Sequence, residues 1–219
     1  KEEGYILYIP LLFLLGYTSF MKKILPQGLD AKDSMKLLST AIAPRPIAFI
    51  STINRNGVPN AAPFCFFMGV TPSPPTVAIS ILKRGDNRKD TIKNIQATRE
   101  FVINIVDETL AQAMNIASGS YPSEMSEFDV AGITPIPSEI VKPPRISESP
   151  VQMECKVKSI LELGDVPASI VVGEIVCFHV QEEFFKDGQI DVRKLKPLGR
   201  AGENIYLRFN EFFELDRPA

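Results

Sequence analysis

The stretch from Ala43 to Asn94 constrains the fold of this chain more than any other part. It opens with the apolar run PRPIAFIST, turns at Asn56-Gly57, and later contains a second apolar run, TVAISIL. Runs of Val, Ile, Phe and Ala bounded by Pro and Gly are typical of buried strands. Asn-Gly is a strong hairpin signal, because both residues accept positive φ. We therefore predict buried strands over residues 47–53 and 76–82.

Between these strands, the segment from Asn60 to Phe67 mixes small and aromatic residues with Pro63. Proline cannot donate a hydrogen bond to a sheet ladder, so this segment predicts an irregular sheet edge rather than a central strand. Such an edge, rich in Ala and Phe, would form a flat apolar wall.

The second strand is followed by a cluster of cations, Arg84, Arg88 and Lys89. They come just before Asp90-Thr91, where an apolar helical spacing begins. The N–H groups of a helix start, a hydroxyl and several cations favour an anion, most naturally a phosphate. A phosphate site beside a flat apolar wall predicts a phosphorylated planar ligand.

The rest of the chain predicts more strands than helices. Strands are expected over 101–106, over 151–163, over 169–180 with a bulge at Gly173, and over 205–215, and a short loop over 198–201. Helices are expected over 30–41 with Asp30 or Asp33 as the cap, over 91–98, and after a cap at Asp107. Residues 119–144, rich in Ser, Pro and Glu, predict a long surface excursion around Phe128 and Ile133 that could cover a ligand or a partner subunit. Six or more strands at short spacing, with few helices, favour a mainly β protein that forms a closed or partly closed barrel.

Size, charge and cysteine content exclude several classes. A chain of 219 residues suffices for one large domain, and its formal charge of −2 argues against general nucleic-acid binding. Three widely spaced cysteines with no CxxC pair, and a single histidine, argue against a disulfide framework and against zinc. We therefore expect no metal, and reduced thiols in the cytoplasm.

The segment from Tyr5 to Phe20 is almost entirely apolar and does not match the rest of the chain. It is shorter than the roughly 20 residues of a spanning helix and contains Pro10. A membrane anchor, a buried strand or helix, and an extension ahead of a start at Met21 remain alternatives. We favour the extension, so residues 1–20 are left out of the fold and residues 21–219 form the expected domain.

Three single residues leave two interpretations open. Arg45 suits either a ligand contact or a surface salt bridge, and Cys65 suits either a redox thiol or a small buried hydrophobe. His179, the only histidine, could contact a ligand or be a satisfied structural residue.

Eight segments in order resemble the flavin reductase-like family of FMN-binding split-barrel proteins. They are PRPIAFIST, NAAPFCFF, the SPP loop, KDTIKNI, EFVINIV, VKPPRISESP, GEIVCFHV and PLGR. The resemblance implies a Greek-key split β-barrel, a homodimer, and FMN bound at the subunit interface. It also implies NADH or NADPH as a transient co-substrate, and a small molecule rather than a nucleic acid as the partner.

The same resemblance implies which residues would bind FMN. They are Arg45, Pro46, Ile47 and Ala48 beside the ribityl chain, Asn60, Ala61, Ala62, Pro63, Phe64, Cys65 and Phe66 along the ring, and Ser80, Arg84, Lys89, Asp90 and Thr91 around the phosphate. Main-chain N–H groups of the ring segment are expected to reach the polar edge of the flavin. Many relatives have serine at the position of Cys65, and a thiol is a weaker donor than a hydroxyl.

The implied reaction passes a hydride from the nicotinamide to flavin N5, and needs no protein acid or base, so we assign no catalytic residue. No GxGxxG motif is present, which fits a nicotinamide bound transiently on the flavin. The alternatives are a reductase of another acceptor, such as ferric iron, and a flavin-binding electron carrier without catalysis.

Overall fold

The computed structural model describes residues 21–83 and 88–218. The apolar segment from Tyr5 to Phe20 and the predicted phosphate ligand Arg84 lie outside these residues. Within the described part, no helix is long and apolar enough to cross a membrane.

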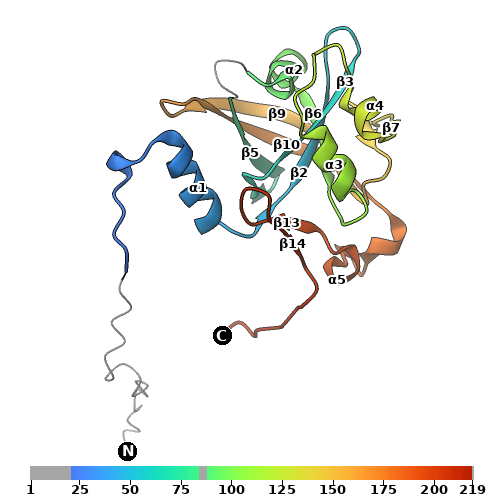
Figure 1. Ribbon diagram of the computed structural model, residues 1–219. Coiled ribbons are helices and arrows are strands. Elements are labelled where there is room, and N and C mark those ends of the chain that lie inside the picture. The colour runs from blue at the N-terminus through green and yellow to red at the C-terminus, as the bar shows by residue number, and fades with distance from the viewer. Residues whose placement is uncertain (1–20, 84–87, 219) are drawn as a thin grey trace, which may run out of the picture.

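The molecule is built around one antiparallel seven-stranded sheet (Figure 1), with the order β3-β2-β6-β9-β10-β5-β4. The strands are β2 (Ala48–Ile53), β3 (Pro59–Phe64), β4 (Phe67–Pro72), β5 (Pro75–Leu82), β6 (Glu100–Ile105), β9 (Val151–Leu163) and β10 (Ala168–Val180). Strands β3 and β4 form the two edges of the sheet, although only two residues separate them in sequence. The barrel is split between these two edges. The predicted mainly β split barrel is confirmed.

Short strands add three small sheets. They are β1 (Arg45–Pro46) with β13 (Leu198–Arg200) and β14 (Tyr206–Arg208), β7 (Pro135–Ile136) with β8 (Arg145–Ile146), and β11 (Phe185–Lys186) with β12 (Gln189–Ile190). The sequence predicted only a loop near β13. Pairing between Arg45 and Arg200 makes it a strand instead, and sequence periodicity does not reveal such a long-range contact.

Two apolar cores lie on opposite faces of the sheet. Ile50 and Phe101 belong to the core inside the barrel, whereas Phe49, Met114 and Phe128 belong to a second core. Neighbouring residues of one strand enter different cores because side chains alternate between the faces of a sheet. The excursion was predicted around Phe128, which anchors it to the second core.

The described helices are α1 (Ala31–Ala41), α2 (Asp90–Thr98), α3 (Ala111–Ala117), α4 (Glu127–Ala131) and α5 (Val192–Leu195), with short 3-10 turns at Pro26–Gly28 and Glu182–Phe184. Ile92 and Ile95 of α2 belong to the core inside the barrel, whereas α3 and α4 pack against the second core. In Figure 1, α3 and α4 lie side by side, whereas α1 stands apart and contains no buried residue. Asp30 caps α1 as predicted, through a 2.7 Å bond from the Asp33 amide. Asp107 bonds to the Leu110 amide, one turn before α3 begins, so it caps that turn and not the helix itself.

Strand β10 is irregular at Gly173, where the sequence predicted a bulge. Its pairing with β9 shifts register between Val172 and Gly173. A Cβ atom on Gly173 would lie 2.5 Å from the Phe101 ring, so only glycine fits at this close approach.

A row of buried polar side chains on the outer face of the sheet holds the excursion in place. Asn104 accepts the Ile146 N–H at 2.9 Å, and Gln152 donates to the Ile146 carbonyl at 2.8 Å. Glu154 accepts the N–H groups of residues 139–141 at 2.7 to 3.0 Å. These side chains replace ladder partners that the irregular segment lacks, which satisfies its buried backbone groups.

Candidate functional site

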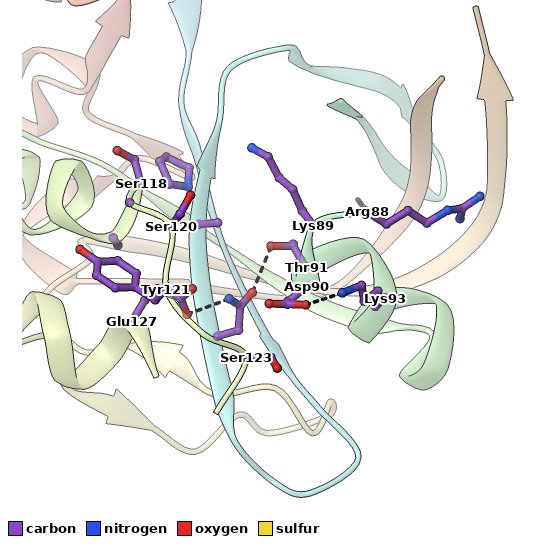
Figure 2. A pocket seen from close by; sticks show the side chains of 15 residues that line it. Arg88, Lys89, Asp90, Thr91, Lys93, Ser118, Ser120, Tyr121, Ser123 and Glu127 are labelled. Carbon is purple, nitrogen blue, oxygen red and sulfur yellow. Dashed lines mark hydrogen bonds and ion pairs between the residues drawn. The ribbon is translucent and has the colours of Figure 1, made fainter. Parts of the chain in front are cut away.

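A cleft of about 490 Å³ lies between β3, the start of α2 and the loop that joins α3 to α4. It is lined by Asn60, Ala62, Pro63, Arg88, Lys89, Asp90, Thr91, Lys93, Ala117, Ser118, Gly119, Ser120, Tyr121, Ser123 and Glu127. Figure 2 shows Ser118, Ser120 and Tyr121 of the loop on one side of β3 and the charged side chains of α2 on the other. The cleft therefore joins a polar wall, a strand edge and a cationic helix start.

The start of α2 combines a cation with main-chain donors. Lys89 is the N-cap residue, and no side chain of the described residues caps this helix end. N–H groups in the first turn of a helix favour an anion. The Lys89 Nζ lies 4.8 Å from the centre of the Phe64 ring, which places this cation at the β3 wall.

The neighbouring cations have other partners. Arg88 points away from the cleft in Figure 2 and pairs with Glu162 of β9 at 3.2 Å. Lys93 pairs with Asp90 one turn earlier at 2.9 Å. Lys89 lines the cleft and reaches the β3 wall at Phe64, so of the cations described here it is the best placed to meet an anion at the helix start.

The free edge of β3 offers fewer donors than the sequence suggested. Outward-facing backbone groups alternate along an edge strand, and here they belong to Pro59, Ala61 and Pro63. The two prolines have no N–H, and the Ala61 N–H donates to Glu127 at 3.2 Å. Main-chain donors for a planar ligand must therefore come from Cys65 and Phe66, which follow the strand.

Asn60 links the three walls of the cleft, and the dashed lines at Glu127 and Thr91 in Figure 2 mark two of its hydrogen bonds. Its amide nitrogen donates to Glu127 at 2.7 Å, and its oxygen accepts the hydroxyl of Thr91 at 3.0 Å. Thr52 donates to the same oxygen at 3.2 Å. Because the Thr91 proton is directed at Asn60, the contribution of Thr91 to an anion site would come from its main-chain N–H.

Glu127 is only 9% exposed. Burial raises the pKa of its carboxyl group above the ordinary value, and the nearby charge of Asp90 acts in the same direction, although hydrogen bonds from Ala61 and Asn60 oppose the shift. No sequence pattern selects this residue, because its role depends on contacts between distant segments.

Beyond the end of β3, Arg45 is 3% exposed and its guanidinium lies 5.4 Å from the centre of the Phe66 ring. It donates to the Cys65 thiol at 3.4 Å and to the carbonyls of Ser39 and Ile42. The alternative of a surface salt bridge is therefore wrong. Arg45 holds the end of α1 against the segment after β3.

The predicted ligand residues fall into three groups. Asn60, Ala62, Pro63, Lys89, Asp90 and Thr91 meet in the cleft. Arg45, Cys65 and Phe66 meet beyond the end of β3, where the Ser80 amide also donates to the Phe66 carbonyl at 2.8 Å. Ile47, Ala48, Ala61 and Phe64 are buried in the two cores, while Pro46 is exposed. For the buried apolar residues, contact with a ligand would fall mainly to the backbone.

The sequence missed most of the loop that faces α2. Ser118, Ser120, Tyr121 and Ser123 were not selected, although the excursion around them was expected to cover a ligand. The only signal was composition, because a run of small polar residues has no spacing that indicates a site.

His179 lies outside the cleft, on the outer face of the sheet. Its Nε2 is 2.7 Å from a Glu154 oxygen and 3.4 Å from the Cys177 sulfur. Burial and the Glu154 charge raise the pKa of the Cys177 thiol. The three groups lie close enough to share a metal, but 2.7 Å is a hydrogen-bond distance and Glu154 already accepts three amides, so we assign none. Of the two alternatives for His179, these contacts favour the structural role.

The split barrel itself indicates a class of protein. A Shewanella frigidimarina NCIMB 400 protein with a split barrel domain superposes with a TM-score of 0.78 at 22% identity, over 88% of this chain and 96% of its own. The chain belongs to the flavin reductase-like family, because the model of the flavin reductase like domain matches residues 40–197. Membership in this family supports the general activity of a flavin-dependent oxidoreductase.

Several relatives match over nearly their whole length. The BH2278 protein of Halalkalibacterium halodurans is 40% identical, over 90% of this chain and 96% of its own. Nitrilotriacetate monooxygenase component B from Bacillus cereus superposes with a TM-score of 0.86 at 36% identity, over 89% and 98% of the two chains. Pseudomonas fluorescens 2-nitrobenzoate 2-nitroreductase NbaA superposes with a TM-score of 0.83 at 32% identity, over 90% and 96%.

Proposed function

We propose that this protein binds FMN in the cleft and transfers electrons from NADH or NADPH through it to a small acceptor. The observation that carries the proposal is the arrangement of Lys89 and the start of α2 beside the β3 wall. A phosphate suits the helix start, because N–H groups and a cation converge there. A planar ring suits the wall, where Ala62 and Pro63 line the cleft.

When bound, FMN would supply the hydride chemistry, and the protein would supply position and electrostatics. Lys89 and the first turn of α2 would hold the phosphate, Asn60 would tie that turn to β3, and the wall would orient the ring. The segment after β3 would supply N–H groups near the charge of the reduced ring, where donors stabilise an anion. None of these steps requires a protein acid or base.

We also propose that residues 21–219 act as a cytoplasmic homodimer. Edge strand β4 is almost entirely exposed, with Met68 at 61% and Val70 at 50%. The amphipathic helix α1 contains no buried residue. An open apolar edge of this kind needs cover, and a second copy would supply it. Light scattering at micromolar concentration should give the mass of a dimer, whereas a flavin-loaded monomer would contradict the proposal.

Anaerobic mixing with NADH and, separately, NADPH tests the function. We expect the protein to purify with FMN or take it up in a titration, and one nicotinamide to bleach its visible absorbance rapidly. Binding of FMN without rapid bleaching would instead support an electron carrier. Protein that binds no flavin would overturn the proposal.

A further inference from the structure

Glu127 connects the excursion to the free edge of β3. It is the first residue of α4, directly after the N-cap Ser126, whose hydroxyl donates to the Pro59 carbonyl at 2.8 Å. The Glu127 carboxylate accepts the next outward group of the strand, the Ala61 N–H. Because Pro59 and Pro63 have no N–H, Glu127 takes the only outward donor that β3 offers.

The same carboxylate fixes the orientation of the Asn60 amide. A carboxylate only accepts hydrogen bonds, so the amide must direct its NH₂ group at Glu127 and its oxygen away from it. The oxygen then faces α2, where it accepts the hydroxyl of Thr91. With the amide reversed, two acceptors would face each other at 2.7 Å and the link to α2 would have no acceptor.

The consequence is a fixed relation between two parts of the cleft. The chain of contacts from Glu127 through Asn60 to Thr91 ties the first turn of α2 to the edge of β3 (Figure 2). Asn94 extends it by donating to Thr52 at 3.1 Å, which in turn donates to Asn60. A ligand with a ring on β3 and a phosphate on α2 fits only if these two elements keep their separation.

We propose that Glu127 is a positioning residue that sets the phosphate anchor at the start of α2 in register with the ring wall on β3. The inference rests on the proposed function. It assigns to Glu127 the preference for FMN over riboflavin, because riboflavin has the ring and lacks the phosphate. A carboxylate that acted only through its charge would do the opposite, since it repels a phosphate.

Two conservative substitutions of Glu127 distinguish the effect of side-chain length from the effect of charge. Glu127→Gln keeps the length of the side chain and an oxygen that can accept the Ala61 N–H, but removes the charge. Glu127→Asp keeps the charge and shortens the side chain by one methylene. The matched control is Asp129→Asn on the same helix, because Asp129 is exposed and the charge change is identical.

Each variant is titrated with FMN and with riboflavin by flavin fluorescence, and its melting temperature is measured without flavin. We expect Glu127→Asp to reduce the preference for FMN about tenfold, the effect of losing one charge-assisted hydrogen bond. Glu127→Gln should reduce it less than about threefold, and Asp129→Asn should match the wild type.

The outcomes that would overturn the inference are distinct. Equal losses for FMN and riboflavin would show a general structural role, and tighter FMN binding by Glu127→Gln with no change in Glu127→Asp would show charge repulsion alone. Unchanged preference in both variants would also refute it. If the wild type binds neither flavin, the proposed function itself fails, and the inference fails with it.

Discussion

Glu127 at the cleft and Glu154 on the outer face of the sheet are both buried carboxylates that accept main-chain hydrogen bonds from another segment. Glu154 is fully buried and accepts three amides together with His179. Glu127 is slightly exposed and accepts one amide from β3 and the side chain of Asn60. Each of them joins the irregular excursion to a regular strand.

The two environments shift the pKa in opposite directions. Burial raises the pKa of the Glu154 carboxyl, but the bonds from Glu139, His179 and the next two amides together outweigh it, so the pKa lies below the ordinary value. For Glu127 burial prevails over the bonds from its own N–H, from Ala61 and from Asn60, and the pKa is raised. The balance between burial and hydrogen-bond donors therefore decides the direction.

This difference distinguishes Glu154, which anchors the excursion, from Glu127, which lies in the candidate ligand site. The charge of a carboxylate with four donors is fully compensated by hydrogen bonds inside the fold, so the group contributes stability. A carboxylate with two donors beside a cleft remains sensitive to any charge that binds nearby. The comparison predicts that the two regions respond to different measurements: stability on the outer face and ligand affinity at the cleft.

The largest effect is expected on the outer face. Glu154→Ala should lower the free energy of unfolding by about 3–5 kcal/mol, because it leaves buried amides and an imidazole without their charged partner. Urea denaturation measures the loss. The control is Glu148→Ala just beyond the excursion, since Glu148 is exposed, accepts the single amide of Thr134 and should cost about 1 kcal/mol or less. If Glu154→Ala lowered the free energy of unfolding only slightly, the distinction between Glu154 as an anchor and Glu127 as part of the site would not hold.

The next effect is expected at the cleft. Lys89→Ala should weaken FMN binding by about one to two decades, because a charged hydrogen bond contributes about 1.5–3 kcal/mol. It should leave the unfolding midpoint almost unchanged. Lys156→Ala, an exposed lysine on β9, serves as the control. Unchanged FMN affinity in Lys89→Ala would exclude the phosphate from the start of α2.

The same contrast shows how far the sequence alone could predict this molecule. Local patterns sufficed for the barrel, because strands such as Ala168–Val180 and the turn after Ile53 are encoded by apolar runs and Asn-Gly. They failed for β13, since its pairing partner is far away in the sequence. Register between distant segments is a tertiary property that periodicity does not contain.

The residues of the candidate site also divide into those that the local sequence predicts and those that it does not. Lys89, Asp90 and Thr91 could be predicted because the chemistry of a helix start is local. Glu127 could not, because its partners Asn60 and Ala61 are 67 and 66 residues away. The structure also shows that the β3 edge has fewer N–H donors than expected, and this depends on which residues of the strand face outward. The binding of FMN by any of these residues stays a prediction.

The smallest effect is the pH dependence of stability, where the two carboxylates should have opposite signs. The folded pKa of Glu127 lies above its ordinary value of 4.5, so in the window between them the native state holds a proton that the unfolded chain has lost. The contribution of Glu127 is therefore greatest below this window and declines as pH rises through it. The folded pKa of Glu154 lies below 4.5, so its contribution is present above that value and is lost as pH falls through the lower window.

Urea denaturation of the wild type, Glu127→Gln and Glu154→Gln at neutral pH, at about pH 5 and at more acid pH separates these contributions. Glu127→Gln should gain stability relative to the wild type between about pH 5 and neutral pH, because it removes a group that becomes costly when ionised. Glu154→Gln should be less stable than the wild type in that range, because it lacks the charge whose contribution is present above 4.5, and the two should converge at more acid pH. If both variants changed the same range with the same sign, the balance between burial and hydrogen-bond donors would not explain the difference between the two carboxylates.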